Sequence, residues 1–319
     1  MIQEFVFDDE ARARVTRAPL RNFHPTLGQG VLVRPRKIER EFEEEVIGDR
    51  DTRQRVDTIR APFRWICSLK VRFRDPDSFD AVDFDAGSGL LISPRHVLTA
   101  AHNVYAQITG SKGTKDKRKA LLVWAYPGRD GDDKFPFGKA ESESIAYLSK
   151  FESNLDVRWD YALIKLKTAI GDQKFSSLGN QALGYWSSTS RATGTLIQPL
   201  SQSFLAGKIV NVSGYPKSQS HTQWVAFDAV RDVPPTIKGQ RVNELITYLT
   251  DTSEGQSGAP VWLFFPDSGR RYLVAVHGGR CHEALDGCKP TRTSQPTSNM
   301  GVVLTKDVVD QIEAWKKSM

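Results

Sequence analysis

Residues 87–102 read GSGLLISPRHVLTAAH. Two apolar runs, LLI and VL, flank an SPR turn, a pattern typical of two adjacent buried β-strands. The second run ends in the small residues TAA, and His102 follows directly. The stretch therefore predicts a β-hairpin that presents a histidine at the end of a buried strand, where its small neighbours leave room for the imidazole ring.

Short segments of the same kind recur from Phe63 onward. Runs such as WICSLKVRF, ALLVWAY, YALIKL, KIVNVSGY, VWLFF and YLVAVH are separated by turns rich in Gly, Pro and Asp. Many short strands with such turns predict an all-β sandwich or barrel rather than an alternating βα sheet. After Thr305, the apolar residues Val308, Ile312 and Trp315 recur at helical spacing and predict a C-terminal helix.

The composition excludes several classes of protein. Of the 319 residues, 39% are hydrophobic and 26% are charged, which argues against a disordered chain, a collagen and a disulfide-dense miniprotein. The length suggests two domains at ~150 residues each, and no apolar run reaches the ~18 residues of a membrane-spanning helix. The net charge of +6 only weakly indicates an acidic partner. We interpret the basic stretch 111–120 (SKGTKDKRKA) as a solvated surface loop, with a grip on an acidic ligand or nucleic acid as the less favoured alternative.

Two further segments carry residues of catalytic type. Asp160 directly precedes the run YALIKL, and Ser257 lies in DTSEGQSGAPV between Gly255 and Gly258. Taken alone, each feature is equally well explained by an ordinary turn, just as a single histidine is usually structural. Together they match the needs of acyl transfer: a serine on a tight turn, a histidine that takes its proton, and a buried carboxylate that orients the ring.

The segments TAAH, DYALIKL and GQSGAPV resemble, in this order, the three signature blocks of chymotrypsin-fold serine proteases. Within that group the chain is most similar, over about residues 46–318, to the glutamyl endopeptidases of the staphylococcal V8 type and their bacillar relatives. The resemblance implies an all-β, trypsin-like fold: two six-stranded antiparallel β-barrels with the active site in the cleft between them, and a C-terminal α-helix outside. It divides the chain into residues 46–189, with the first barrel and the linker, and residues 190–319, with the second barrel and the helix.

The resemblance also implies a serine endopeptidase and assigns roles to its residues. Ser257 would be the nucleophile, His102 the general base and then acid, and Asp160 the orienting carboxylate. The backbone amides of Gly255 and Ser257 would form the oxyanion hole. The alternative, from another functional class, is a catalytically silent protease-fold binding module; the presence of all three catalytic residue types favours the enzyme.

The expected specificity is for Glu (or Asp) on the acyl side of the cleaved bond. In the glutamyl type a histidine and a hydroxyl bind the substrate carboxylate, and the matching residues here are His277 and Thr252. These donors can satisfy a buried carboxylate without a second full charge. The alternative is a trypsin-like preference for Arg or Lys, because Asp251 lies six residues before the nucleophile. Gly278 and Gly279 would pair with the substrate backbone as an added strand.

Residues 1–45 differ from the rest: they are rich in Arg and Glu, and they end in the acidic run EREFEEE. After Glu45, the sequence VIGDRD resembles the mature start of the glutamyl endopeptidases, in which the freed α-amine helps to bind the substrate carboxylate. We therefore expect residues 1–45 to be a propeptide that is removed after Glu45. The enzyme itself is a candidate for this cleavage. The new amine of Val46 is expected to take part in substrate binding. The alternative is an ordinary disordered leader.

The three cysteines leave the compartment open. Cys67 is expected to be buried in a strand. Cys281 and Cys288 enclose a short loop, and we expect them to form a disulfide. The less favoured alternative is a metal site formed by both cysteines and His282. The first residues lack the apolar core of a signal peptide, so the chain as written predicts an intracellular protein or one whose leader has been removed. The resemblance instead implies secretion.

The expected partners are protein or peptide substrates. We expect no cofactor, no metal, no nucleic-acid partner and no membrane partner, and we expect a monomer.

Overall fold

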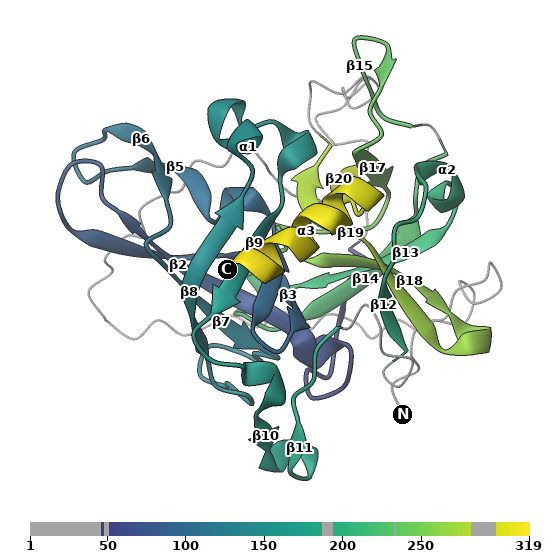
Figure 1. Cartoon of the computed structure of the whole chain (residues 1–319), viewed down its shortest axis with the longest axis horizontal. Helices are drawn as coiled ribbons and strands as arrows, with labels where there is room; N and C mark the ends of the chain where they lie inside the picture. The colour runs from purple at the N-terminus through teal and green to yellow at the C-terminus, as the bar shows by residue number, and fades with distance from the viewer. Residues whose placement is uncertain (1–45, 48–50, 187–193, 233, 282–297) are drawn as a thin grey trace.

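The computed structural model describes residues 46–47, 51–186, 194–232, 234–281 and 298–319. Within these residues the chain forms two β-barrels, followed by a helix at the C-terminal end (Figure 1). The N-terminal region 1–45 and the predicted boundary between residues 189 and 190 lie outside the described residues.

Six antiparallel strands close the first barrel in the order β2-β3-β4-β9-β8-β7. They are β2 (Ile66–Arg74), β3 (Ala81–Ser93), β4 (His96–Thr99), β7 (Leu122–Pro127), β8 (Ala140–Tyr147) and β9 (Ala162–Leu166). Alternate residues such as Val71 in β2 point inward and are fully buried. The predicted hairpin is β3–β4, with Leu90 opposite Leu98, and a 3-10 turn just after β4 carries His102.

The second sheet runs β1-β14-β13-β18-β19-β20-β17. Its strands are β1 (Gln54–Arg55), β13 (Ile209–Gly214), β14 (Trp224–Ala229), β17 (Leu245–Tyr248), β18 (Pro260–Phe265), β19 (Arg270–Arg280) and β20 (Asn299–Val303). A bridge between Val230 and Tyr248 joins the end of β14 to β17. The sheet therefore curls into a second barrel, which consists of the six strands β13, β14, β17, β18, β19 and β20. The expected trypsin-like, all-β fold is therefore confirmed. One strand was not expected: β12 (Thr195–Ile197) pairs with β19 in parallel.

Shorter elements decorate the barrels. The hairpins are β5 (Tyr105–Thr109) with β6 (Lys115–Lys119), β10 (Lys174–Phe175) with β11 (Gln181–Ala182), and β15 (Thr236–Ile237) with β16 (Gln240–Arg241); the short helices are α1 (Ser149–Asn154) and α2 (Gln202–Leu205). The basic stretch 111–120, predicted as a loop, contains strand β6, whose lysines at 115, 117 and 119 are exposed.

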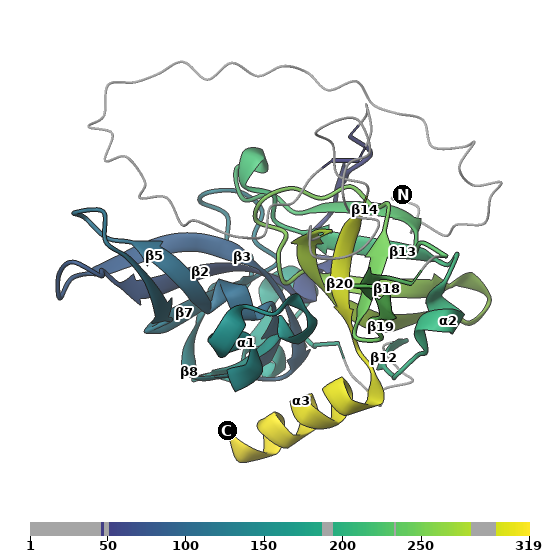
Figure 2. The ribbon, with the colours of Figure 1, turned by 90° about the horizontal axis from the view of Figure 1, so that it is seen from above.

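The predicted C-terminal helix is α3 (Lys306–Ser318). Thr305 caps its N-terminus, since its hydroxyl accepts a bond from the amide of Val308. The helix follows β20 of the second barrel and reaches across to the first, where Trp315 packs against Tyr161 with ring centroids 5.5 Å apart (Figure 2). The expected C-terminal helix on the outside is confirmed, and its contact with Tyr161 joins the two barrels. Across the described residues, no helix is both long and apolar enough to cross a membrane.

The two barrels approach each other closely at Gly258. This residue has φ +82°, and a Cβ there would lie 2.2 Å from Oγ1 of Thr99, 2.3 Å from the carbonyl oxygen of Ser88 and 2.8 Å from the amide of Ala100. Two of these atoms belong to the backbone of the first barrel, which cannot move without disturbing β3 and β4. Only glycine fits at this point of contact.

We predict that Gly258→Ala lowers the free energy of unfolding by about 3 kcal/mol or more, because the added methyl collides with backbone atoms. Gly269→Ala is the matched control: Gly269 also has positive φ (+64°), but a Cβ there meets nothing within 4 Å. The control should lose only about 1 kcal/mol from its backbone conformation. Urea denaturation of both variants measures the difference, and equal losses would contradict the collision.

Candidate active site

His102 and Asp160 form a buried pair inside the first barrel. The strands β4 and β9, which pair with each other, lead to the two residues. Nδ1 of His102 lies 2.6 Å from Oδ2 of Asp160, and the backbone amide of His102 donates to Oδ1 at 2.9 Å. A carboxylate only accepts hydrogen bonds, so Nδ1 carries the hydrogen and Nε2 is the basic nitrogen of the ring. With exposed fractions of 4% and 1%, the pair is held in one orientation and shielded from water.

Ser257 lies on the turn that leads into β18 and is fully buried. Two residues earlier, Gly255 has φ +103°, and a Cβ there would lie 2.4 Å from the carbonyl oxygen of Tyr215. The amide of Gly258 donates to the carbonyl of His277 at 2.7 Å, which attaches the turn to β19. The expectation that glycines allow a tight turn around this serine therefore agrees with the geometry.

Two residues of the first barrel contact the backbone of this turn. The amide of Ser88 and the side-chain Nδ2 of Asn103 both donate to the carbonyl oxygen of Ser257, at 2.8 and 2.9 Å. The hydroxyl of Ser88 donates to the carbonyl of Gly255 at 2.8 Å. Because Asn103 directly follows His102, these bonds bring the serine turn and the histidine together. Sequence reasoning assigned no role to either residue, although Ser88 lies within the stretch 87–102 and Asn103 directly follows it.

His277 and Thr252 are both fully buried in the second barrel. Nδ1 of His277 lies 2.6 Å from the hydroxyl of Tyr248, which also lies 2.9 Å from the carbonyl oxygen of Met300. Burial, and then the nearby His102, lower the pKa of His277 to about 3, so its ring is neutral near neutral pH. The hydroxyl of Thr252 has no hydrogen-bond partner among the described residues. Sequence reasoning missed Tyr248.

Gly278 and Gly279 lie on β19 where its pairing with β20 is irregular. A Cβ on Gly278 would lie 3.6 Å from Oδ2 of Asp160, so this strand passes close to the buried pair. Gly279 has φ +136°. At these two glycines, β19 therefore runs past the buried pair of His102 and Asp160.

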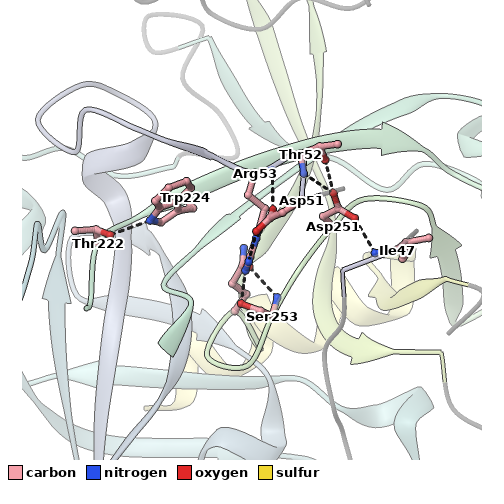
Figure 3. A network of polar contacts seen from close by, with 9 residues as sticks. Ile47, Asp51, Thr52, Arg53, Thr222, Trp224, Asp251 and Ser253 are labelled. Carbon is pink, nitrogen blue, oxygen red and sulfur yellow. Dashed lines mark hydrogen bonds and ion pairs between the residues drawn. The ribbon is translucent and has the colours of Figure 1, made fainter. Parts of the chain in front are cut away.

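Asp251 contacts the N-terminal segment of the described chain (Figure 3). Its Oδ1 accepts from the amide of Ile47 at 2.8 Å, and its Oδ2 accepts from the amide of Thr52 at 2.7 Å and from the hydroxyl of Thr52. The residue is 2% exposed. Both carboxylate oxygens are thus engaged within the chain.

The cysteines bear on the alternatives left open by the sequence. Cys67 is buried and free, and burial raises the pKa of its thiol. Cys281 is disulfide-bonded, which favours the disulfide interpretation over a metal site; Cys288 and His282 lie outside the described residues. Among the described residues, no group of three His, Cys, Asp or Glu side chains is arranged to hold a metal ion.

Comparison with known proteins agrees with this architecture. The extracellular metalloprotease of Bacillus subtilis is 26% identical over 83% of this chain and 68% of its own length, and the glutamyl endopeptidase of Bacillus licheniformis is 28% identical over 86% and 69%. A solved structure of a Glu endopeptidase in complex with MPD superposes with a TM-score of 0.58 at 23% identity, over 85% of this chain and 99% of that one. The profile of the trypsin-like peptidase domain matches residues 87–264. The chain belongs to the trypsin-like peptidase family and is a serine endopeptidase.

Proposed function

We propose that this endopeptidase works through His102, Asp160 and Ser257 and prefers Glu on the acyl side of the cleaved bond. The observation that carries the proposal is the buried His102–Asp160 pair, at 2.6 Å, next to a serine turn that is bonded to the residue after His102. Protein and peptide chains are the substrates.

In the proposed mechanism, Oγ of Ser257 attacks the scissile carbonyl carbon while Nε2 of His102 takes the hydroxyl proton. The amides of Gly255 and Ser257 donate to the oxyanion that forms. The C–N bond then breaks, and the leaving amine takes the proton from His102. Water, deprotonated by the same nitrogen, attacks the acyl ester; the C–O bond to Ser257 breaks, Oγ takes the proton back from His102, and the acid product leaves. Asp160 stays ionised throughout and stabilises the imidazolium.

Labelling with a fluorophosphonate probe tests the nucleophile. The wild-type protein should form a covalent adduct, and Ser257→Ala should lose both the adduct and peptidase activity, by about a million-fold. The exposed hydroxyl of Ser268 supplies a control, because Ser268→Ala should label like wild type. A labelled Ser257→Ala variant would contradict the assignment, and wild type that begins at Val46 and stays unlabelled would favour the silent binding module.

The preference for Glu rests on the surroundings of Thr252 and His277. Thr252 has a buried hydroxyl that can donate to a substrate carboxylate, and His277 lies on the strand attached to the serine turn. The relatives point the same way, since one is a glutamyl endopeptidase and one solved neighbour is a Glu endopeptidase. Preference for Arg or Lys would need the carboxylate of Asp251, and its two oxygens already accept bonds from Ile47 and Thr52. We therefore favour Glu.

The hydrogen bonds of Tyr248 determine how His277 would meet a carboxylate. The phenol hydrogen is used on the carbonyl of Met300, so the phenol oxygen accepts from Nδ1–H of His277. In the neutral ring Nε2 is then an acceptor, which a carboxylate does not bind. Binding of Glu accordingly requires uptake of one proton on Nε2, so the ring would meet the carboxylate as a charged donor rather than as the uncharged donor expected from the sequence.

A panel of chromogenic peptides that differ only in Glu, Gln, Asp, Arg or Lys before the cleaved bond tests this step. We predict the highest kcat/KM for Glu, and a Glu-to-Gln ratio that falls as pH rises. The free ring has a pKa of about 3, whereas the complex keeps the proton to higher pH. Each unit of pH therefore costs up to about tenfold in the affinity for Glu and nothing for neutral Gln. A ratio independent of pH contradicts the proton uptake, and cleavage only after Arg or Lys contradicts the specificity.

We propose further that the chain is a zymogen cleaved between Glu45 and Val46. The segment after this bond reaches the loop that bears Thr252, because the amide of Ile47 bonds Asp251. A free amine on Val46 would add a positive charge one residue away from that bond. Such a charge favours an acidic substrate side chain at this loop.

Mass spectrometry of purified active protein tests the processing. Wild type should begin at Val46, whereas Glu45→Gln and Ser257→Ala should both keep residues 1–45 if the enzyme cleaves itself after Glu. Glu44→Gln is the neighbouring control and should be processed normally. Full activity of protein that still carries residue 1 would contradict the zymogen.

The disulfide bond of Cys281 and the name of the B. subtilis relative support export to an oxidising compartment. A monomeric state and the absence of a nucleic-acid partner stay predictions.

A further inference from the structure

Arg53 is a charged residue with almost no access to water. Its side chain is 5% exposed and lies between the segment before β1 and the loop before Ser257 (Figure 3). Burying a guanidinium is costly unless it is paired and its N–H groups are used. The partners of its guanidinium therefore indicate the role of this buried charge.

One side of the guanidinium is neutralised by Asp51. Nε lies 2.9 Å from Oδ1 and Nη2 lies 2.6 Å from Oδ2, a bidentate pair, and the backbone amide of Arg53 also donates to Oδ1 at 3.0 Å. Burial acts to raise the pKa of Asp51, but the bonds from Arg53 lower it overall. The pair is thus held as ions, with the guanidinium plane fixed.

The remaining nitrogen, Nη1, contacts the loop that precedes the nucleophile. It donates to the hydroxyl of Ser253 and, at 3.3 Å, to Oε1 of Gln256. The same Oε1 accepts from the backbone amide of Ser253 at 3.0 Å. Gln256 is fully buried and stands between Gly255 and Ser257, the two residues whose amides would form the oxyanion hole.

We propose that Arg53 is a positioning residue of the peptidase: by fixing Gln256 it sets the orientation of the two oxyanion-hole amides. The inference rests on the proposed roles of Gly255 and Ser257. Asp251 anchors the other end of the loop to Ile47 and Thr52, so the segment around Arg53 braces the loop at both ends.

The experiment compares Arg53→Ala and Arg53→Lys with Arg55→Ala. Arg55 is the matched control, because it lies two residues on, its side chain is 53% exposed, and it pairs with Asp130 away from the loop. We expect Arg53→Ala to lower kcat about a hundred-fold, the size of losing one oxyanion donor, with KM changed little. The kcat of Arg53→Lys should lie between those of wild type and Arg53→Ala, because an ammonium cannot both make the bidentate pair with Asp51 and reach Gln256. Arg55→Ala should match wild type.

Two inhibitors separate positioning from general loss of structure. A peptide boronate places an oxygen in the oxyanion hole, whereas the matching peptide alcohol, with CH2OH in place of the boronic acid group, leaves the hole empty of charge. Arg53→Ala should lower the affinity for the boronate by about the same factor as it lowers kcat, and it should leave the affinity for the alcohol unchanged. Equal weakening of both ligands, or a boronate affinity equal to that of Arg55→Ala, would overturn the proposal.

Two further variants keep the outcome interpretable. If Arg53→Ala does not fold, Arg53→Lys and Ser253→Ala carry the same test, and a normal boronate-to-alcohol ratio in both counts against the brace. If Ser257→Ala keeps peptidase activity, the proposed nucleophile is wrong, and the inference falls with it. If Ser257→Ala is inactive while Arg53→Ala is normal, only the brace is wrong.

Discussion

The structure depends on how the carbonyl oxygen of Ser257 is held. This oxygen belongs to the second barrel, yet it accepts hydrogen bonds from the amide of Ser88 and the side chain of Asn103, both of which belong to the first. Each bond is buried, so an error in the placement of the barrels would leave a donor or acceptor unpaired at a cost of about 1–3 kcal/mol. Because Asn103 follows His102, the contact that joins the barrels also brings His102 and the turn of Ser257, the proposed base and nucleophile, together.

Such close contact between two backbones requires residues without side chains. A Cβ on Gly87 would lie 2.6 Å from the amide group of Asn103 and 2.7 Å from the carbonyl of Ser257, and Gly258 is crowded in the same way by the first barrel. The glycines on either side of the interface therefore serve geometry that is shared by the barrels, not only the local turn. The short motif around residue 87 is as much a part of the site as the motif around Ser257.

The fold was predictable from the sequence, and the residues proposed for catalysis could be identified there, because their signals are local. A histidine after a buried strand, an aspartate before one and a serine between glycines each appear within a few residues, and their order matches the family. Tyr248 and Asn103 carried no such signal, since their roles arise from bonds to His277 and Ser257 that only the closed barrels create. The sequence also left Asp251 ambiguous: an acidic residue six positions before the nucleophile suits a trypsin-like pocket, and only its bonds to distant amides show how its carboxylate is used.

The partner of Arg53 in the loop before Ser257 is the neutral side chain of Gln256, and the negative charge of the oxyanion gives a physical reason for this neutrality. In the proposed mechanism, negative charge develops next to the amides of Gly255 and Ser257, and a carboxylate between them would oppose it. Arg53 instead meets the neutral amide of Gln256, while Asp51 balances its charge on the far side, where the carboxylate is 30% exposed. The guanidinium can therefore orient the loop without adding negative charge beside the oxyanion. Asp160 is placed in a comparable way: its carboxylate contacts Nδ1 of His102, on the side of the ring away from Nε2, the atom that takes the proton in the proposed mechanism.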